Sequence, residues 1–414
     1  MTAEMIPAIL IFLMTYVLIS GRKLNLIRIG RPAGVMLGTV LMIVAGVMVP
    51  ARVPELINWD TILLLLGMMI IIEHLADADF FALVARRVEL MHLSVYGLLA
   101  LVVFGLGFLA AFLVNDIVCI FFTPLILIMI HSRRLPPMPF LLALATSTNI
   151  GGAMAFTGNP QNMIIGSLSG ISYGRFFLLM FPIGCLGLGI NYLLLLKMFR
   201  KELAEAQDAF VTSADLLVRP LLKRSVAVTL AVVVGFFLFN NIAWVAMSGA
   251  TLLMVLSNRD EGTLLRRVDW NLLLFFAGLF VVIGGLQAAG VTGLVLGQFE
   301  RLLQGGPRAF FGFGILTVIG SNLFANVPYV LVIAESIMAM PEPVTMWFAL
   351  AFASTIAGNL TILGAVANVI VVERARGTCD ITFRDFFRFG LPSTVAILTV
   401  GMSILWVYHL LGLI

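Results

Sequence analysis

One carboxylate lies where an apolar sequence would not be expected to carry a charge. Asp116 is located between the hydrophobic runs 95–114 and 117–130. A carboxylate at that depth is costly in hydrocarbon and is by default a functional group, because it can exchange a proton or bind a cation. The alternative is a structural role, in which the carboxylate caps the helix that follows it.

A second group of polar residues lies further along the chain. The stretch 146–166 reads TSTNIGGAMAFTGNPQNMIIG and places glycine, proline and amide side chains inside a hydrophobic region. Glycine costs about 1 kcal/mol and an interior proline about 3 kcal/mol in a helix, so the pattern predicts an interrupted helix. A break within the membrane is tolerated only where the freed backbone groups face protein or a water-filled cavity. Carbonyl groups there attract cations and N–H groups attract anions or polar oxygens, which indicates a binding site.

The chain carries this pattern twice. GAMAFTGNPQN (152–162) aligns with GNLTILGAVAN (358–368), and both read Gly-x5-Gly-x3-Asn. Asn115, in FLVNDIV, matches Asn326, in LFANVPY, at an offset of 211 residues. NWDTILLLLGMM matches DWNLLLFFAGLF at the same offset. Three matches in the same order predict a duplicated unit.

Composition places these groups in a membrane protein. Of 414 residues, 61% are hydrophobic and 11% are charged, whereas soluble domains carry about 25% charged residues. Runs such as 176–196 and 391–411 are long enough to cross a hydrocarbon core of about 30 Å. Such long unbroken runs favour helices over a barrel. The three cysteines are scattered and fit neither a disulfide framework nor a metal site, so no metal and no cofactor is expected.

The basic residues indicate an orientation rather than a nucleic-acid surface. One topology puts 21 of the 25 Lys and Arg residues in cytoplasmic loops and leaves four outside: Arg52, Arg175, Arg301 and Arg308. This is the distribution that the positive-inside rule requires, and it places both chain termini outside. The expected location is the cytoplasmic (inner) membrane.

The crossings define the expected fold. The run 95–130 returns to the side from which it starts, so each unit has five net spans and the second unit must be inverted. We predict an all-α polytopic membrane protein, an inverted-topology repeat of two five-span units, each with a re-entrant helical hairpin and a broken transmembrane helix. The first unit covers 1–200, with its hairpin at about 95–130 and its broken helix at about 139–168; a charged cytoplasmic linker covers 201–222; the second unit covers 223–414, with its hairpin at about 310–340 and its broken helix at about 344–372.

Inverted repeats with interrupted helices in matching positions are typical of secondary transporters, whose site lies near the bilayer midplane. One such motif could reflect only tight helix packing by small residues, but two matched motifs favour binding. The candidate substrate- or ion-binding residues are Asn115, Asp116, Thr148, Asn149, Thr157, Gly158, Asn159 and Asn162 in the first unit, and Asn326, Gly358, Asn359, Thr361, Gly364 and Asn368 in the second. Asp116 and Glu335 are the candidate proton-coupling groups, and Glu335 could instead face the rim.

Four segments carry a resemblance to a known family: NIGGAMAFTGNPQN, LVNDIVCIFFTP, SNLFANVPYVLVI and AGNLTILGAVANVIVVE. Through them the chain resembles the ion transporter superfamily, and within it the group of arsenite permeases and sodium–proton antiporters that includes the melanosomal P-protein. The resemblance implies about ten spans plus two re-entrant hairpins, a fold shared with dicarboxylate and citrate carriers. Sodium-coupled dicarboxylate carriers have Ser-Asn-Thr at both hairpin tips. The tips here read VND and ANVP, which disfavours dicarboxylate transport and sodium coupling.

Charge also bears on the substrate. None of the 25 Lys and Arg residues lies within a predicted span, so a di- or trivalent anion would meet only amides and helix N-termini opposite Asp116. A neutral trihydroxide such as arsenite or antimonite needs only hydrogen-bond donors and acceptors. We therefore expect a secondary active transporter that couples efflux of arsenite or antimonite to protons. A sodium/proton antiporter and a cation-coupled di- or tricarboxylate symporter of the same fold are the alternatives.

Other classes of protein fit the sequence less well. An enzyme is not expected, because no metal cluster, nucleophile motif or phosphate loop accompanies Asp116 and Glu335. The chain has no P-loop, so any ATP drive would need a soluble ATPase subunit, a partner that the resemblance allows. The other expected partners are the inorganic substrate, protons and the lipid bilayer, with no nucleic acid. The resemblance also allows a homodimer, because relatives of this fold include dimers. A passive channel is disfavoured by the inverted half-sites.

Overall fold

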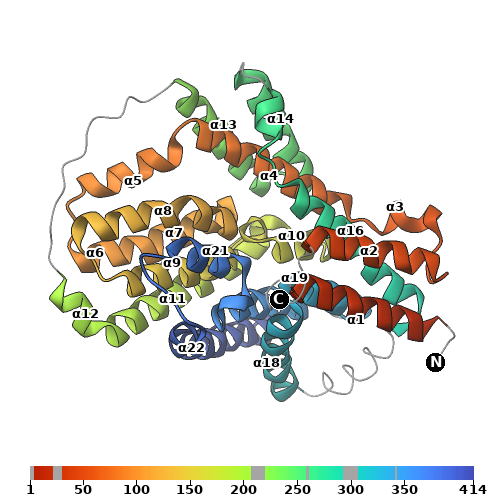
Figure 1. Ribbon diagram of the computed structural model, residues 1–414. Coiled ribbons are helices and arrows are strands. Elements are labelled where there is room, and N and C mark those ends of the chain that lie inside the picture. Colours follow the sequence, from red (N-terminus) through yellow and green to blue (C-terminus); the bar gives the residue numbers. More distant parts are fainter. Residues whose placement is uncertain (1–3, 22–29, 207–219, 258–260, 292–305, 341–342) are drawn as a thin grey trace.

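The computed structural model describes residues 4–21, 30–206, 220–257, 261–291, 306–340 and 343–414. Within these ranges the chain forms helices joined by turns and contains no strand (Figure 1). Seven of the described helices are long and apolar enough to cross a membrane, and five further apolar helices are shorter. The prediction of an all-helical protein with several membrane spans is therefore confirmed for this part of the chain.

Six helices form a group that we call the scaffold helices. They are α1 (Met5–Gly21), α2 (Arg31–Val44), α4 (Trp59–Asp77), α13 (Pro220–Leu238), α14 (Ile242–Ser257) and α16 (Trp270–Ala288). α4 packs against α14, and α16 packs against α2 (Figure 1). A Cβ on Gly67 would lie 2.8 Å from the Ala246 backbone, and one on Gly278 would lie 2.5 Å from the Val35 side chain. The matched glycines thus let two helix pairs approach closely in the same way.

One helical hairpin follows the scaffold helices of each half. Hairpin 1 consists of α6 (Val95–Ala100), a π-helical segment (Leu101–Gly105), α7 (Leu106–Leu113) and α8 (Asn115–Arg133); hairpin 2 consists of α18 (Pro307–Phe324) and α19 (Asn326–Met338). The single tip residues are Val114, with φ +65°, and Ala325, with φ +61°. Neither is a glycine, so both tips hold a left-handed backbone that L-residues rarely adopt and that stores strain.

Two helices are interrupted where the sequence carries its glycine motifs. In the first, α9 (Pro137–Gly152) gives way to a 3-10 turn (Phe156–Gly158) before α10 (Pro160–Leu168) begins. In the second, α20 (Val344–Ile356) is followed by two 3-10 turns (Ala357–Asn359 and Ile362–Gly364) before α21 (Val366–Ala375) begins. We call the interrupted segments the first break and the second break. The helices after them, α11 (Tyr173–Met198) and α22 (Phe383–Leu410), pack against each other.

Short elements connect these helices. They are a 3-10 turn (Pro50–Arg52), α3 (Val53–Leu56), α5 (Phe80–Leu90), α12 (Arg200–Glu205) and α15 (Glu261–Leu265). The predicted linker 201–222 includes most of α12 and the first turn of α13, while its residues 207–219 lie outside the described ranges. Arg301, one of the four basic residues expected outside, also lies outside the described ranges.

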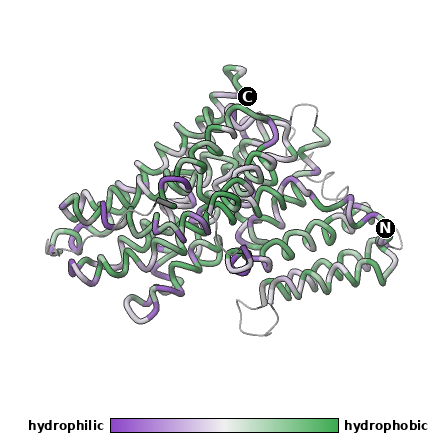
Figure 2. The backbone as a smooth tube through the Cα atoms, turned by 90° about the horizontal axis from the view of Figure 1, so that it is seen from above, coloured by the Kyte–Doolittle hydropathy of each residue, from purple (hydrophilic) through white to green (hydrophobic). Residues whose placement is uncertain are grey.

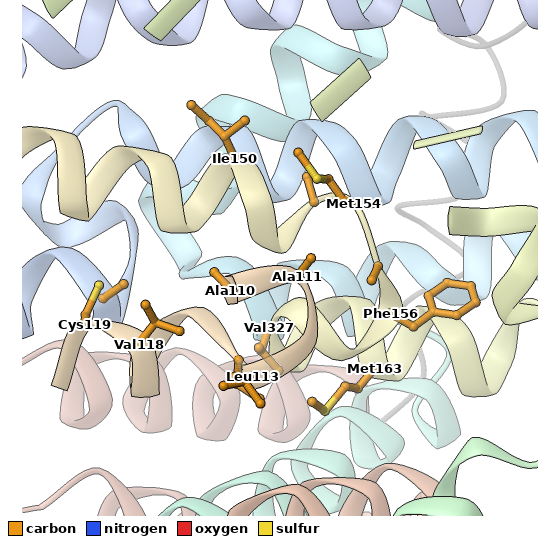
Figure 3. Packing of buried hydrophobic residues seen from close by; sticks show 14 of the residues in the cluster. Ala110, Ala111, Leu113, Val118, Cys119, Ile150, Met154, Phe156, Met163 and Val327 are labelled. Carbon is orange, nitrogen blue, oxygen red and sulfur yellow. The ribbon is translucent and has the colours of Figure 1, made fainter. Parts of the chain in front are cut away.

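The two broken helices run through the centre of the protein. Every residue from 139 to 165 is buried, as is every residue from 347 to 359. Figure 2 shows hydrophobic residues along most of the helices and hydrophilic residues mainly at their ends and in the connections. Figure 3 shows part of the buried cluster, which includes Ala110 and Leu113 of hairpin 1, Phe156 of the first break, Met163 of α10, and Val327 of hairpin 2. Burial on all sides explains why α9 and α20 show no amphipathic pattern.

Candidate binding site at the two helix breaks

Asn149, in the last turn of α9, joins three other asparagines. Its Oδ1 accepts a hydrogen bond from Asn115 Nδ2, at the tip of hairpin 1, over 2.9 Å. Its Nδ2 donates to Oδ1 of Asn359 and to Oδ1 of Asn368, both at 3.0 Å. All four side chains are buried. One amide therefore connects hairpin 1, the first break and the second break.

Each break is closed by the asparagine that ends its motif. Asn162 Nδ2 donates to the Gly152 carbonyl at 3.0 Å and to a second carbonyl three residues further on at 3.4 Å. Asn368 Nδ2 makes the matching bonds, to the Gly358 carbonyl at 2.6 Å and to a carbonyl three residues further on at 2.9 Å. An interrupted helix leaves its last carbonyl groups without intrahelical partners. These two side chains satisfy such groups, which explains the Gly-x5-Gly-x3-Asn spacing.

The two breaks also exchange contacts. Asn159 caps α10, accepting from Asn162 N at 2.9 Å, and its Nδ2 donates to Thr355 Oγ1 at 3.2 Å. Thr355 Oγ1 lies 3.5 Å from Asn162 Oδ1, at the outer limit of a hydrogen bond. Thr355 occupies the position of Asn149 in the repeat. Each half therefore extends one side chain from this position to the closing asparagine of the other half.

Close backbone approach explains the glycines of the site. A Cβ on Gly158 would lie 2.3 Å from the Gly152 carbonyl oxygen, and one on Gly364 would lie 2.9 Å from the Gly358 carbonyl oxygen. A Cβ on Gly151 would lie 1.8 Å from a backbone oxygen of hairpin 1. Any side chain at Gly151 or Gly158 would force the backbone apart.

The two predicted threonines of the first half have partners within the protein. Thr157 Oγ1 donates to the Ala111 carbonyl of hairpin 1 at 3.0 Å and lies 2.9 Å from the Tyr173 hydroxyl. Thr148 Oγ1 donates to a carbonyl of its own helix at 2.9 Å and lies 3.2 Å from the Cys119 thiol. These contacts attach the first break to hairpin 1.

The two candidate coupling carboxylates lie in different places. Asp116 is half-buried in the first turn of α8, where the helix dipole favours a negative charge, and its N–H donates to Asn115 Oδ1 at 2.9 Å. Glu335 is half-buried on α19 and lines a cavity of about 420 Å³, together with Asn58 and Gln287 of the scaffold. Asp116 is therefore next to the asparagine network, whereas Glu335 lies beside the scaffold.

Two amide atoms among the predicted site residues of the second half have no partner. Among the described residues, Asn359 Nδ2 and Asn326 Oδ1 are buried without a hydrogen-bond partner. A buried polar group in this state costs about 1–3 kcal/mol. A ligand that accepts from Asn359 and donates to Asn326 would offset that cost.

Sequence reasoning missed two asparagine positions, half-buried Asn322 and buried Asn191. Asn322 of α18 donates to the Ala357 carbonyl at 2.9 Å and accepts from Thr361 Oγ1 at 2.9 Å, so it joins hairpin 2 to both sides of the second break. Asn191 of α11 donates to two hydroxyls of α9, at 2.8 and 3.0 Å, and accepts from Ser393 Oγ of α22 at 3.0 Å. Each is an amide within a largely apolar run, which is the signal that could have identified it.

Comparison with known proteins gives consistent matches. A family described as Citrate transporter matches residues 10–352. The chain is similar to the putative transporter arsB of Dictyostelium discoideum, at 26% identity over 91% of this chain and 87% of that protein. It is similar to the silicon efflux transporter LSI3 of Oryza sativa subsp. japonica, at 32% identity over 91% of this chain and 92% of that protein. It is also similar to the P protein of Homo sapiens, at 27% identity over 92% of this chain and 57% of that protein.

Proposed function

This chain belongs to the citrate transporter family and is a membrane transporter, and from that premise we propose that it exports arsenite or antimonite in exchange for protons. The family match confirms the resemblance that the sequence motifs carry. The transport direction, the substrate and the coupling ion are the proposed part. The proposed location is the cytoplasmic membrane, with both termini outside, as the basic residues favour.

The observation that carries the proposal is the chemistry of the asparagine network. Among the described residues, its members are all neutral amides: Asn115, Asn149, Asn159, Asn162, Asn359 and Asn368. No Lys or Arg is among the side chains to which these amides hydrogen-bond. A buried tricarboxylate needs paired positive charge, because an unpaired buried charge is strongly unfavourable. The network therefore favours a substrate without charge.

The two unpartnered amide atoms of the second half support a hydroxide ligand. A hydroxyl group both donates and accepts hydrogen bonds. It can accept from Asn359 Nδ2 and donate to Asn326 Oδ1, whereas a carboxylate can only accept. Dissolved silicon is also a neutral hydroxide, so the name of the rice relative, a silicon efflux transporter, is consistent with this class of substrate.

Coupling is assigned to Asp116, with Glu335, in the cavity between the scaffold helices and α19, as a second group. Asp116 lies next to the network, so its charge state acts directly on the tip of hairpin 1. The two breaks are proposed to be half-sites of an inverted repeat that meet at the membrane centre. The reciprocal contacts of Asn149 and Thr355 support that arrangement.

Everted membrane vesicles test the proposal. An imposed proton gradient should drive uptake of arsenite and antimonite, and Asp116→Asn should abolish it. Asp380→Asn, which neutralises an exposed carboxylate in the turn after α21, is the control and should transport normally. Normal pumping by Asp116→Asn would remove the coupling assignment, and uptake that ignores the gradient would remove proton coupling altogether.

The family description favours a second candidate, cation-coupled uptake of citrate or a related carboxylate. Citrate should then raise the unfolding temperature of the purified protein, whereas arsenite should not. A sodium/proton antiporter is the third candidate on this fold. Proton release on addition of Na⁺ to reconstituted protein would identify it.

A further inference from the structure

Three side chains join the scaffold helices to the first broken helix. Asn58 Nδ2 donates to Ser167 Oγ at 3.0 Å, and the hydroxyls of Thr61 and Ser167 are 3.2 Å apart. Ser167 lies in the last turn of α10, whose N-terminal end carries Asn159 and Asn162 of the binding site. One nine-residue helix therefore connects the site to this contact.

The second half has carboxylates at the matching positions. Asn58 caps α4 by accepting from Thr61 N at 2.9 Å, and Asp269 caps α16 in the same way by accepting from Leu272 N at 3.1 Å. The two caps are equivalent. The side chain of Asp269, however, has no N–H to donate as Asn58 does, and Leu272 has no hydroxyl as Thr61 does.

The residue on the second broken helix that matches Ser167 is also a carboxylate. Ser167 is the fifth residue after the asparagine that closes the first break, and Glu373 is the fifth after the one that closes the second. Glu373 and Asp269 are both exposed. α10 packs against α4, whereas α21 packs against α8 and α9. In the structure, therefore, the contact between α10 and α4 is formed, whereas the matching contact between α21 and α16 is not.

We propose that Asn58, Thr61 and Ser167 form a latch that favours the state in which α10 rests on α4. Asp269 and Glu373 disfavour the opposite state, in which α21 rests on α16, because the two carboxylates would repel each other there. In an inverted repeat, the α10–α4 contact gives way to the α21–α16 contact only when the binding site opens to the other membrane face. The latch therefore rests on the transport function proposed above. One neutral hydrogen bond of typical net strength, about 1 kcal/mol, changes the ratio of two states about five-fold.

The cavity beside the latch offers a reporter position. Asn58, Leu168 and Leu331 line the cavity of about 420 Å³ between the scaffold helices and α19. In the proposed topology it lies near the outer face. Separation of α10 from α4 widens it and admits solvent, so a cysteine at Leu331 reports whether the latch is closed.

The experiment measures labelling of Leu331→Cys by a membrane-impermeant maleimide in intact cells, in a background of Cys185→Ala and Cys379→Ala. The same background without the reporter corrects for the buried Cys119. Arg52→Cys, on the exposed turn before α3, serves as the control for sidedness and should label equally in every variant.

Variants at the latch and at its mirror position should move labelling in opposite directions. Ser167→Ala removes the hydroxyl that makes both contacts to α4 and should raise the labelling rate at least about five-fold, the effect of one hydrogen bond. Asn58→Asp keeps the helix cap but removes the donor, and should act in the same direction. Asp269→Asn combined with Glu373→Ser removes the repulsion at the mirror position, and should also raise labelling while α4 and α10 themselves stay unchanged.

Two further results separate the possible failures. Asn58→Asp with Ser167→Glu places the mirror pair at the latch and should give the highest labelling of all variants. Equal labelling in all variants, at wild-type unfolding temperature and with substrate transport intact, would overturn the latch and leave the transporter proposal standing. Absence of gradient-driven transport by the parent protein would instead overturn the proposed function.

Discussion

Asn149 should be the most sensitive side chain of the site, because three partners depend on it. Asn149→Ala removes three hydrogen bonds and leaves Asn115 Nδ2, Asn359 Oδ1 and Asn368 Oδ1 without these contacts. Side-chain hydrogen bonds within membrane proteins average about 0.6 kcal/mol, which gives about 2 kcal/mol for three. Partners that stay unpaired cost about 1–3 kcal/mol each. We therefore expect a loss of about 2–5 kcal/mol and complete loss of transport.

Asn191→Ala is the matched control. It also removes three buried hydrogen bonds, but its partners are hydroxyls of α9 and α22 and not amides of the asparagine network. Hydroxyls can return to carbonyls of their own helix, as Thr146 already does at 2.7 Å. This variant should lose about 1–2 kcal/mol and keep transport.

The two measurements are unfolding of the purified protein in detergent and uptake of substrate by proteoliposomes with equal protein content. Transport at the wild-type rate by Asn149→Ala would refute the assignment of the network to the site. Equal loss of transport in both variants would show that the loss follows from reduced stability alone.

Three more changes test the structure. Gly151→Ala places a Cβ 1.8 Å from a backbone oxygen of hairpin 1 and should reduce the yield of folded protein severely, whereas Gly189→Ala, with open space around it, should not; fluorescence-detected size exclusion compares them. Asn322→Leu removes the bonds across the second break. Expressed as free energies, the increase in KM for substrate should exceed the loss in free energy of unfolding, and a normal KM would contradict this. Ala325→Gly relieves the strain of φ +61° and should stabilise by about 1 kcal/mol, whereas Ala353→Gly in the interior of α20 should destabilise by about as much; thermal unfolding gives the sign of each.

Several elements follow from local sequence. The breaks occur where glycines follow or end α9 and α20, and α10 begins at Pro160 with an asparagine cap. These rules act over a few residues, so one sequence is sufficient to apply them. The asparagines of both motifs were predicted as site residues because amides are rare in hydrocarbon. The structure brings Asn115, Asn149 and Asn368 together.

Other features have no local signal. The hairpin tips have Val114 and Ala325 at positive φ, a backbone conformation in which glycine or asparagine is more usual. The burial of Thr157 against Ala111 also depends on how hairpin 1 packs onto the first break.

The sequence by itself indicated a protein of the lipid bilayer with interrupted helices, because hydrophobicity and helix propensity are properties of short segments. It also indicated a duplication, through its matched motifs. The tertiary structure alone decided which amides meet. Asn149 bonds to residues more than 200 positions away, and Asn58 is joined to Ser167 across 109 positions. Such pairs depend on how helices from the two halves pack, and their energies arise only once that packing has removed water from them.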